Sequence, residues 1–368
     1  MPATCCAPTV RAALSTDGLL AYCRPGFEPE LAAELSERAA IAGFAGYAKT
    51  QRNSGYVEFL TSPGDSGEPR GEALSIALPY TQLVFARQKL RLFAELDSLD
   101  PKDRVTPMLD AIAGRGRFGE LLVEHPDSDE HKPLAGLARA FGNALRPALR
   151  QRGLLTDKED ARLPRLHVCF LAGNHALLAS SSVKDSSPWP LGVPRLRSSS
   201  DAPSRSALKL DEALMVFLGE GEREKLLQPG MCAADLGAAP GGWSWVLAKQ
   251  HIRVFAVDNG PMAETALATG LIEHIRADGF HWQPPKTLDW LVCDMVESPR
   301  RVAARMAEWF ANGWCRQAIF NLKLPMKKRW DETRLCLEMF EQQAGRPLRI
   351  RAKQLYHDRE EITVYASP

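Results

Sequence analysis

The sequence has 368 residues, which is longer than one ordinary domain, so we expect several domains with separate hydrophobic cores. Lys and Arg together number 46, Asp and Glu together number 45, and the formal net charge is only +1. This balance excludes a uniformly basic protein. Any surface for nucleic acid must arise from local clustering of basic side chains, and the overall charge neither supports nor excludes RNA.

Cysteine spacing and hydropathy point away from metal binding and from membranes. The cysteines lie mostly among apolar neighbours without the paired C-x-x-C spacing of a zinc site, at Cys5, Cys6, Cys23, Cys169, Cys232, Cys293, Cys315 and Cys336. No stretch approaches the roughly 20 apolar residues that span a bilayer, and the first residues lack the apolar core of a signal peptide. We expect a soluble cytoplasmic protein with reduced thiols, no bound metal and no membrane contact.

Residues 1–68 are predicted to form a small α+β unit. A short apolar strand is expected at 19–23, a helix over 30–43 and a hairpin strand at 56–60. The stretch SPGDSGEPRGE, in which Gly, Pro and Ser accumulate, ends this unit.

Residues 69–182 are predicted to form a second unit. Strands are expected near 83–96, 120–124 and 166–171, and helices near 107–113 and 134–152. On the last helix, apolar residues fall on one side and arginines on the other: Leu134, Leu137, Phe141, Leu145 and Ala148 against Arg139, Arg146 and Arg150. Arginines on a single helix more often form a solvated face. Phosphate contact gains weight only if the same chain modifies RNA.

Residues 183–206 are predicted to be an interdomain linker, because the stretch is rich in Ser, Pro and Arg and lacks apolar periodicity. Over 207–368, short apolar strands alternate with amphipathic helices, which predicts a doubly wound α/β domain. Its seven strands are expected at 231–236, 254–257, 272–276, 288–293, 318–322, 348–355 and 362–365. The last two leave no room for a helix between them and should pair antiparallel.

The segment AADLGAAPGGWSWVLAKQ carries the most specific motif. An apolar strand ends at Leu236, a glycine-rich turn follows, and a helix is expected to begin near Gly242. Glycines at such a turn let the backbone approach a ligand closely at the carboxyl edge of a sheet. The spacing is not G-x-G-x-x-G and no G-K-[ST] follows, so binding of a dinucleotide or a nucleoside triphosphate loses support.

Three consecutive strands of this domain each end near a carboxylate, at Asp258, Asp278 and Asp294. Strand ends in doubly wound sheets face the ligand crevice, and Asp258 is placed to accept hydrogen bonds from ribose hydroxyls. A single such Asp is about as often a turn residue or a helix cap. The three together favour a binding site.

Five separated motifs, SRSALKLDEA, DLGAAPGGWS, VCDM, FNLKLP and REEITVYA, together resemble the FtsJ-type ribose 2'-O-methyltransferases. The whole chain is most similar to the bacterial members that methylate a cytidine of 23S rRNA. The resemblance implies a Rossmann-like domain that binds S-adenosylmethionine, preceded by a ferredoxin-like unit and a THUMP RNA-binding unit. It also implies 23S rRNA or its precursor as the partner, one cytidine of the peptidyl-transferase loop as the target, and no obligatory protein partner.

The family uses a Lys-Asp-Lys-Glu tetrad, which by motif position falls on Lys209, Asp294, Lys323 and Glu361. The cofactor-binding residues that the resemblance implies are Ser206, Ala239, Pro240, Gly241, Gly242, Asp258, Asp278 and Asp294. Glu360 and Glu361 are adjacent, and their side chains would point to opposite faces of a sheet. Glu361 is chosen because it immediately precedes the apolar strand ITVYA, as in the family pattern.

The chemistry explains why such a tetrad is needed. A ribose 2'-hydroxyl is a weak nucleophile, so transfer of a sulfonium methyl group requires a base and alignment of oxygen, carbon and sulfur. Lys323, which ends the apolar strand AIFNL, can act as the base only as a neutral amine. We therefore expect desolvation and the neighbouring cation Lys209 to lower its pKa, while Asp294 and Glu361 orient the amines.

Basic residues surround the end of this strand, at Lys327, Lys328, Arg329, Arg349, Arg351 and Lys353, and the last three alternate along one face of a predicted strand. Ordinary solvent-facing charge is the alternative. Beside a ribose-modifying centre, a rim that contacts phosphates is the favoured interpretation.

Two other functions remain open. In an RNA base methyltransferase, Cys293 would be a covalent nucleophile, but its place in the apolar strand LDWLVCD favours a buried structural thiol. The D-P-P-Y or N-P-P-Y pattern of amino-methylating enzymes is also absent. The other alternative is an RNA-binding assembly factor without catalytic turnover, against which the intact set of four tetrad residues argues.

Overall fold

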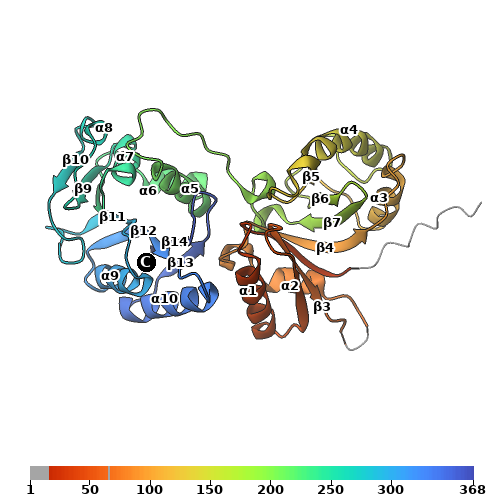
Figure 1. Cartoon of the computed structure of the whole chain (residues 1–368), viewed down its shortest axis with the longest axis horizontal. Coiled ribbons are helices and arrows are strands. Elements are labelled where there is room, and N and C mark those ends of the chain that lie inside the picture. The colour runs from red at the N-terminus through yellow and green to blue at the C-terminus, as the bar shows by residue number, and fades with distance from the viewer. Residues whose placement is uncertain (1–15, 65–66) are drawn as a thin grey trace, which may run out of the picture. The chain divides into compact units, whose positions relative to one another are not determined.

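The computed structural model describes residues 16–64 and 67–368, which belong to two compact units (Figure 1). The first unit extends to Val193 and the second begins at Pro194. The expectations about the first residues, including Cys5 and Cys6, lie outside the described residues. Each unit has its own seven-stranded sheet.

The sheet of the first unit has the strand order β2-β3-β1-β4-β7-β6-β5. The strands are β1 (Gly18–Tyr22), β2 (Gly46–Thr50), β3 (Tyr56–Thr61), β4 (Gln88–Leu96), β5 (Glu120–Glu124), β6 (Arg165–Ala172) and β7 (His175–Ser181). The α-helices are α1 (Glu28–Ile41), α2 (Gly71–Ala77), α3 (Val105–Ile112) and α4 (Ala135–Gln151). The elements from β1 to β4 follow the β-α-β-β-α-β order of a ferredoxin-like unit. Because β4 pairs with both β1 and β7, both N-terminal units that the sequence predicts contribute to one sheet.

Helix α4 has the two-sided character that the sequence predicts. Phe141 and Leu145 are buried in the core beside β5 and β6, and Leu134, Leu137 and Ala148 pack against the same core. Arg139 and Arg150 are exposed on the helix. Burial of the apolar stripe therefore fixes how α4 lies on the sheet.

Part of the predicted linker is packed against the first unit. Ser187 is fully buried, and its backbone N–H donates to Oε1 of Gln88 at 2.9 Å. The carbonyl oxygen of Ser187 accepts from Arg165 at 2.9 Å. The backbone of Ser187 thus ties this part of the stretch to buried side chains of the sheet. The domain boundaries after residues 68 and 182 stay predictions.

The second unit contains seven strands and six α-helices among its described residues. The strands are β8 (Cys232–Leu236), β9 (Arg253–Val257), β10 (Ile272–Ile275), β11 (Leu288–Cys293), β12 (Cys315–Lys323), β13 (Arg349–Lys353) and β14 (Glu361–Ser367). The helices are α5 (Ala207–Phe217), α6 (Glu220–Leu226), α7 (Gly242–Lys249), α8 (Glu264–Leu267), α9 (Pro299–Ala311) and α10 (Arg329–Ala344). All seven strands that the sequence predicts are present, with ends that differ by up to a few residues.

The sheet of the second unit has the order β10-β9-β8-β11-β12-β14-β13. Strands β8 to β12 pair in parallel, whereas β14 pairs antiparallel with both β12 and β13, which confirms the predicted antiparallel pair. The strand order reverses between β8 and β11. In doubly wound sheets, a ligand binds outside the carboxyl ends of the strands at such a reversal.

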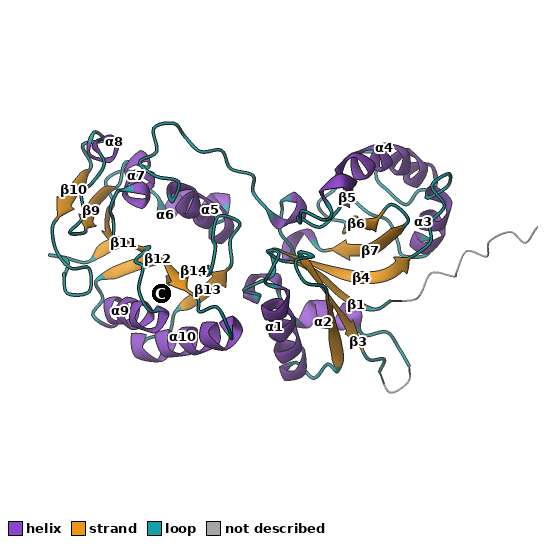
Figure 2. Ribbon diagram, viewed as in Figure 1, coloured by secondary structure: helices purple, strands orange, loops and turns teal. Residues whose placement is uncertain are grey.

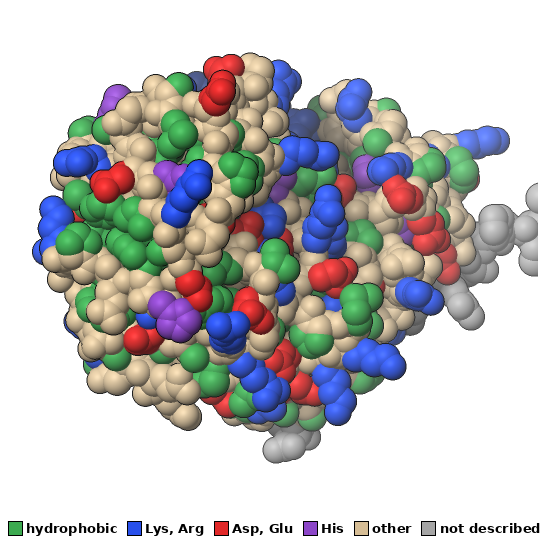
Figure 3. Space-filling model, turned by 60° about the vertical axis from the view of Figure 1, so that its left-hand side comes forward, with side chains coloured by type: hydrophobic (Ala, Val, Ile, Leu, Met, Phe, Trp, Pro, Cys, Tyr) green, Lys and Arg blue, Asp and Glu red, His purple; other side chains and the backbone are tan. Residues whose placement is uncertain are grey.

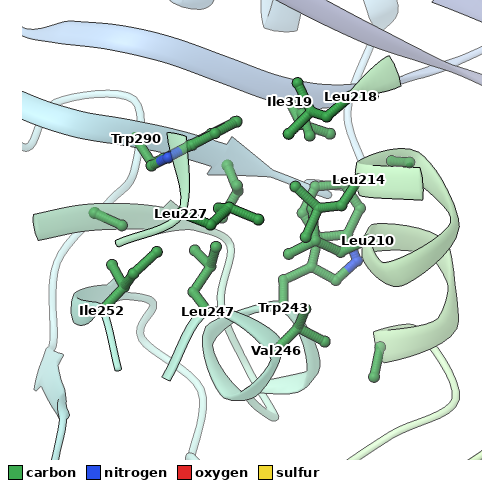
Figure 4. Packing of buried hydrophobic residues seen from close by; sticks show 14 of the residues in the cluster. Leu210, Leu214, Leu218, Leu227, Trp243, Val246, Leu247, Ile252, Trp290 and Ile319 are labelled. Atoms are coloured by element: carbon green, nitrogen blue, oxygen red, sulfur yellow. The ribbon is translucent and has the colours of Figure 1, made fainter. Parts of the chain in front are cut away.

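Helices cover both faces of this sheet, with α5 and α7 on one face and α9 and α10 on the other (Figure 2). The core beneath α5 and α7 joins Leu210 and Leu214 of α5 to Trp243 and Val246 of α7 (Figure 4). Trp290 of β11 lies in the same core, and its indole N–H donates to the carbonyl oxygen of Leu226 at 2.6 Å. This packing holds the N-terminal end of α5 close to the start of α7.

Candidate active site

The glycine-rich turn lies where the sequence predicts it, between the end of β8 at Leu236 and the start of α7 at Gly242. Gly237 and Gly241 have φ angles of 75° and 108°. Side chains at these positions would be strained, so the path of the turn depends on glycine. The turn thereby exposes backbone groups at the carboxyl edge of the sheet, at the reversal of strand order.

Ser206 lies against this turn from the start of α5. A Cβ atom on Gly242 would come within 2.5 Å of the hydroxyl oxygens of Ser204 and Ser206. The indole N–H of Trp243 donates to the carbonyl oxygen of Ser206 at 3.0 Å. The absence of a side chain at Gly242 therefore allows this serine segment to close over the start of α7.

Asp258 follows β9 and reaches the same turn. Its Oδ2 accepts a hydrogen bond from the backbone N–H of Ala239 at 3.0 Å, and its Oδ1 accepts from Gly260 at 2.7 Å. A carboxylate oxygen has two lone pairs, so each oxygen retains one acceptor position. Asp258 thus braces the turn and still has lone pairs for ligand hydroxyls.

Asp278 is less closely connected to these residues than its place in the sequence predicts. It lies three residues beyond the end of β10 and is exposed. Its oxygens accept from the backbone N–H of Phe280 at 2.8 Å and contact His281 at 2.7 Å. Its neighbour Gly279 lies against Leu236 and Gly237, so the loop itself borders the turn.

The four residues that the resemblance assigns to a tetrad come together in one cluster, which we call the tetrad cluster. Nζ of Lys323 lies 2.6 Å from Oδ1 of Asp294, and Nζ of Lys209 lies 3.2 Å from Oδ2 of the same carboxylate. Glu361 forms ion pairs with both lysines. Each carboxylate thus bridges the two amines, and each amine bridges the two carboxylates.

The sheet explains how these residues meet. Lys323 ends β12 directly opposite Glu361, which starts β14, and Asp294 follows β11, the parallel neighbour of β12. Lys209 reaches the cluster from the first turn of α5. Of the two adjacent glutamates, Glu361 faces the cluster, whereas Glu360 binds Arg329 at 2.6 Å.

The tetrad cluster is mostly shielded from water, with side-chain exposures of 16% for Lys209, 16% for Asp294, 23% for Lys323 and 6% for Glu361. Burial alone would raise the pKa of Asp294, but Lys323 and Lys209 hold that pKa below its ordinary value. Asp294 is therefore an anion at neutral pH.

The prediction that the pKa of Lys323 is lowered is wrong. Desolvation does act to lower the pKa of Lys323, but the charges of Asp294 and Glu361, together with their hydrogen bonds, raise it above its ordinary value. The expectation placed too much weight on Lys209 as a neighbouring cation. Both carboxylates bind Lys323 directly, so the ammonium form is the stable one.

The basic rim is only partly as expected. Lys327 and Lys328, which follow Lys323 by a few residues, are exposed, whereas Arg329 is buried and bound to Glu360. On β13, Lys353 is buried and Arg351 lies 5.1 Å from the ring centroid of Tyr365. Arg349 at the start of β13 is exposed and pairs with Glu222 at 2.8 Å, so only the part of this face beyond it is covered by neighbouring elements. The space-filling view shows basic and acidic side chains interspersed over one face (Figure 3).

Three buried polar residues near the tetrad cluster were not singled out from the sequence: Asn321, Asp358 and Thr363. Asn321 donates from Nδ2 to Oδ1 of Asp294 at 2.9 Å. Its position two residues before Lys323 is the available sequence signal, since residues two apart in a strand share a face.

Asp235 in β8 is a further buried polar residue that was not singled out from the sequence. Its carboxylate accepts a hydrogen bond from Ser244 at 2.7 Å, and burial raises the pKa of Asp235 to about 7.

Cys293 is fully buried in β11, and burial raises the pKa of its thiol to about 12. The thiolate that a covalent base-methylating enzyme needs is therefore strongly disfavoured.

All six cysteines in the described residues are free thiols. In the same part of the chain, no three His, Cys, Asp or Glu side chains are grouped to hold a metal ion, and no helix is long and apolar enough to cross a membrane.

Comparisons with known proteins match the chain along most of its length. Three family models match: RlmM ferredoxin-like domain at residues 16–90, Ribosomal RNA large subunit methyltransferase M, N-terminal, at 103–182, and FtsJ-like methyltransferase at 202–341. Among solved structures, TrmN from Thermus thermophilus matches at 18% identity with a TM-score of 0.33, over 95% of this chain and 99% of that one. That score is too low to identify the fold.

Curated relatives are much more similar. Ribosomal RNA large subunit methyltransferase M from Xanthomonas campestris pv. campestris (strain B100) is 68% identical over 95% of this chain and 99% of its own length. The protein of the same name from Xanthomonas axonopodis pv. citri (strain 306) is also 68% identical, with the same coverage. The chain therefore belongs to the Ribosomal RNA large subunit methyltransferase M family, and its second unit is an FtsJ-like methyltransferase domain.

Proposed function

We propose that this methyltransferase transfers the methyl group of S-adenosylmethionine to the 2'-oxygen of a ribose in RNA. The tetrad cluster is the observation that carries the proposal. It places the amine of Lys323 between two carboxylates, beside the edge of the sheet where the glycine-rich turn lies. A base held next to a cofactor turn suits methylation of a hydroxyl, which must lose its proton during transfer.

The residues around the turn fit S-adenosylmethionine. Asp258 has acceptor positions for the hydroxyls of a nucleoside ribose, and the backbone N–H groups at the start of α7 suit the carboxylate of the methionine part. Ser206, Ala239, Pro240, Gly241 and Gly242 would line this site, together with Asp278 and Asp294 at its edge. When bound, S-adenosylmethionine supplies an electrophilic methyl group on a positively charged sulfur.

In the proposed reaction, Lys323 is the general base. The 2'-hydroxyl would give its proton to Nζ of Lys323, while its oxygen would take the methyl group that the sulfonium of S-adenosylmethionine would release. Because Asp294 and Glu361 favour the ammonium form, Lys323 must release a proton before it can act. Lys209 and the two carboxylates keep the amine aligned with the hydroxyl.

The proposed substrate is 23S rRNA or its precursor, at one cytidine of the peptidyl-transferase loop, and the proposed compartment is the cytoplasm. The name of the curated relatives and the resemblance of the motifs support the choice of this rRNA as the substrate. Lys327 and Lys328 are exposed a few residues beyond Lys323, where cations can contact the phosphates next to the target ribose. We propose that the first unit consists of a ferredoxin-like part and a THUMP part, and that it provides the larger RNA surface.

Nucleoside analysis tests this proposal. The protein, labelled S-adenosylmethionine and 23S rRNA lacking its native modifications are incubated, and the product RNA is digested to nucleosides and mapped. We expect label in 2'-O-methylcytidine at one position, and the same 2'-O-methyl group missing from rRNA of cells without the gene. Label on a cytosine base, or no transfer despite RNA binding, would favour one of the two alternative functions.

A further inference from the structure

Buried polar side chains adjoin the tetrad cluster along β12 and β14. In the ladder between these strands, Lys323 stands opposite Glu361, and Asn321 stands opposite Thr363. Residues two apart in a strand share a face, so the Asn321–Thr363 pair lies next to the pair in the tetrad cluster. Asn321, Thr363 and Asp358 are each 0% exposed. Their hydrogen bonds must therefore be made within the protein.

The hydrogen bonds of these residues all donate toward Asp294: Thr363 donates to Asn321, and Asn321 donates to Asp294. Asp294 is an anion and accepts only, so the group 2.9 Å from its Oδ1 is the NH₂ group of Asn321. The amide oxygen of Asn321 then faces Thr363, whose hydroxyl donates to it at 2.8 Å. A hydroxyl has one proton. Thr363 has thus used its proton, although its oxygen also lies 3.1 Å and 3.0 Å from the two carboxyl oxygens of Asp358.

Asp358 must supply the proton for its contact with Thr363. The backbone N–H of Leu355 donates to Oδ2 of Asp358 at 2.9 Å, so this oxygen already accepts a hydrogen bond. The surroundings agree with this assignment, because burial and then the negative charge of Glu361 raise the pKa of Asp358 to about 8. With this raised pKa, Asp358 is mainly a neutral carboxylic acid near pH 7 and can donate to Thr363, in the same direction as the bonds from Thr363 to Asn321 and from Asn321 to Asp294.

We propose that Asp358, Thr363 and Asn321 form a positioning chain for the tetrad cluster. The chain holds the carboxylate of Asp294 in the orientation in which one oxygen binds Lys323 and the other binds Lys209. This inference rests on the proposed function of the cluster in methyl transfer. The three residues act through Asp294, which lies only at the edge of the proposed cofactor site, so their loss slows transfer far more than it weakens cofactor binding.

Thr363 offers the sharpest test, because valine has almost the same shape and cannot donate a hydrogen bond. Single-turnover methyl transfer to 23S rRNA and calorimetric affinity for S-adenosylmethionine are measured for each variant. Thr363→Val should slow transfer at least about tenfold, since displacement of catalytic groups by about 1 Å can cost roughly 100-fold. Its cofactor affinity should stay within about threefold of wild type. Thr363→Ser keeps the hydroxyl and should restore the rate to within about threefold.

Thr333 of α10 provides a matched control. It is also 0% exposed in the second unit, and its hydroxyl has no hydrogen-bond partner in the described structure. Thr333→Val therefore removes a buried hydroxyl and leaves every hydrogen bond of the positioning chain in place. Its transfer rate should match wild type. A loss equal to that of Thr363→Val would overturn the proposal, because removal of any buried hydroxyl would then have the same effect.

Asp358→Asn tests the direction of the chain independently. An asparagine amide can donate to Thr363 and accept from Leu355, as the neutral acid does, so transfer should stay within about threefold of wild type. A loss above about tenfold would overturn the assigned direction. Unchanged transfer in Thr363→Val, or a loss of cofactor affinity equal to its loss of rate, would overturn the positioning role. If wild-type protein forms no 2'-O-methylated nucleoside in the same assay, the proposed function itself fails.

Discussion

Asn321 and Lys323 share one face of β12 and donate to the same oxygen, Oδ1 of Asp294, at 2.9 Å and 2.6 Å. One carboxylate thus receives a neutral donor and a cation on one oxygen, while Lys209 occupies the other. The neutral donor helps to lower the pKa of Asp294. Geometry and charge at the tetrad cluster therefore depend on side chains from β11, β12 and α5 at once.

Replacement of Asp258 should weaken cofactor binding much more than RNA binding. Asp258→Ala removes the acceptors of the backbone N–H groups of Ala239 and Gly260, as well as those proposed for the cofactor ribose. Hydrogen bonds to charged groups are worth about 1.5–3 kcal/mol, so we expect roughly 10- to 100-fold weaker binding of S-adenosylmethionine. Calorimetry measures the cofactor and filter binding measures the RNA. Unchanged cofactor affinity in a folded variant would rule out this role.

The second unit should fold without the first. A fragment from Pro194 to Pro368 contains the entire second sheet and its core, and it should unfold cooperatively and bind S-adenosylmethionine. It should methylate 23S rRNA poorly, because the proposed RNA surface of the first unit is missing. The checks are circular dichroism, calorimetry and a transfer assay, with the full chain as control. Transfer by the fragment at the full-length rate would show that the first unit is dispensable for recognition.

Asp235 should make stability depend on pH. Burial raises its pKa to about 7, so its contribution to stability is complete below its unfolded value of about 3.9 and is lost as the pH rises through 7. Asp235→Asn cannot ionise and keeps an acceptor for Ser244. The variant should therefore gain up to a few kcal/mol relative to wild type between pH 5 and pH 8, since one pKa unit corresponds to about 1.4 kcal/mol. Urea unfolding at both pH values measures this, and a difference that does not change with pH would contradict it.

The parts of the site that follow from one strand at a time could be predicted from the sequence. Asp258 follows from the pattern alone, because it ends an apolar strand and strand ends meet at one edge of the sheet. Lys323 is assigned by the resemblance to the family, and its place at the end of an apolar strand supports that assignment. Burial by another element could not be predicted. The basic face of β13 looks solvent-exposed in the sequence, yet Arg351 lies against the ring of Tyr365 and donates to the carbonyl oxygen of Phe217 in α5.

Two further features could not be predicted from the sequence, each for its own reason. The strand β7 contains Ala-Leu-Leu-Ala and no β-branched residue, so its propensity gave no strand signal. The pKa of Lys323 was predicted in the wrong direction because its value depends on how closely both carboxylates approach the amine, and only the paired strands reveal that distance.

The rate of methyl transfer should rise with pH across the neutral range. The carboxylates raise the pKa of Lys323, so the ammonium form predominates at pH 7 and the neutral amine increases about tenfold for each pH unit below that pKa. Single-turnover rates at saturating cofactor and RNA should increase in proportion. A rate that does not change between about pH 6.5 and pH 8.5 would mean that no lysine of raised pKa acts as the base.

The most direct test of the account is Lys323→Ala, measured for single-turnover transfer and for affinity toward S-adenosylmethionine. The amine acts on the ribose hydroxyl, so cofactor affinity should stay nearly unchanged. Transfer should fall by about 10²- to 10⁴-fold, the usual contribution of general base catalysis, and the residual rate should lose its dependence on pH. Residual transfer within about tenfold of wild type would contradict the assignment of Lys323 as the base.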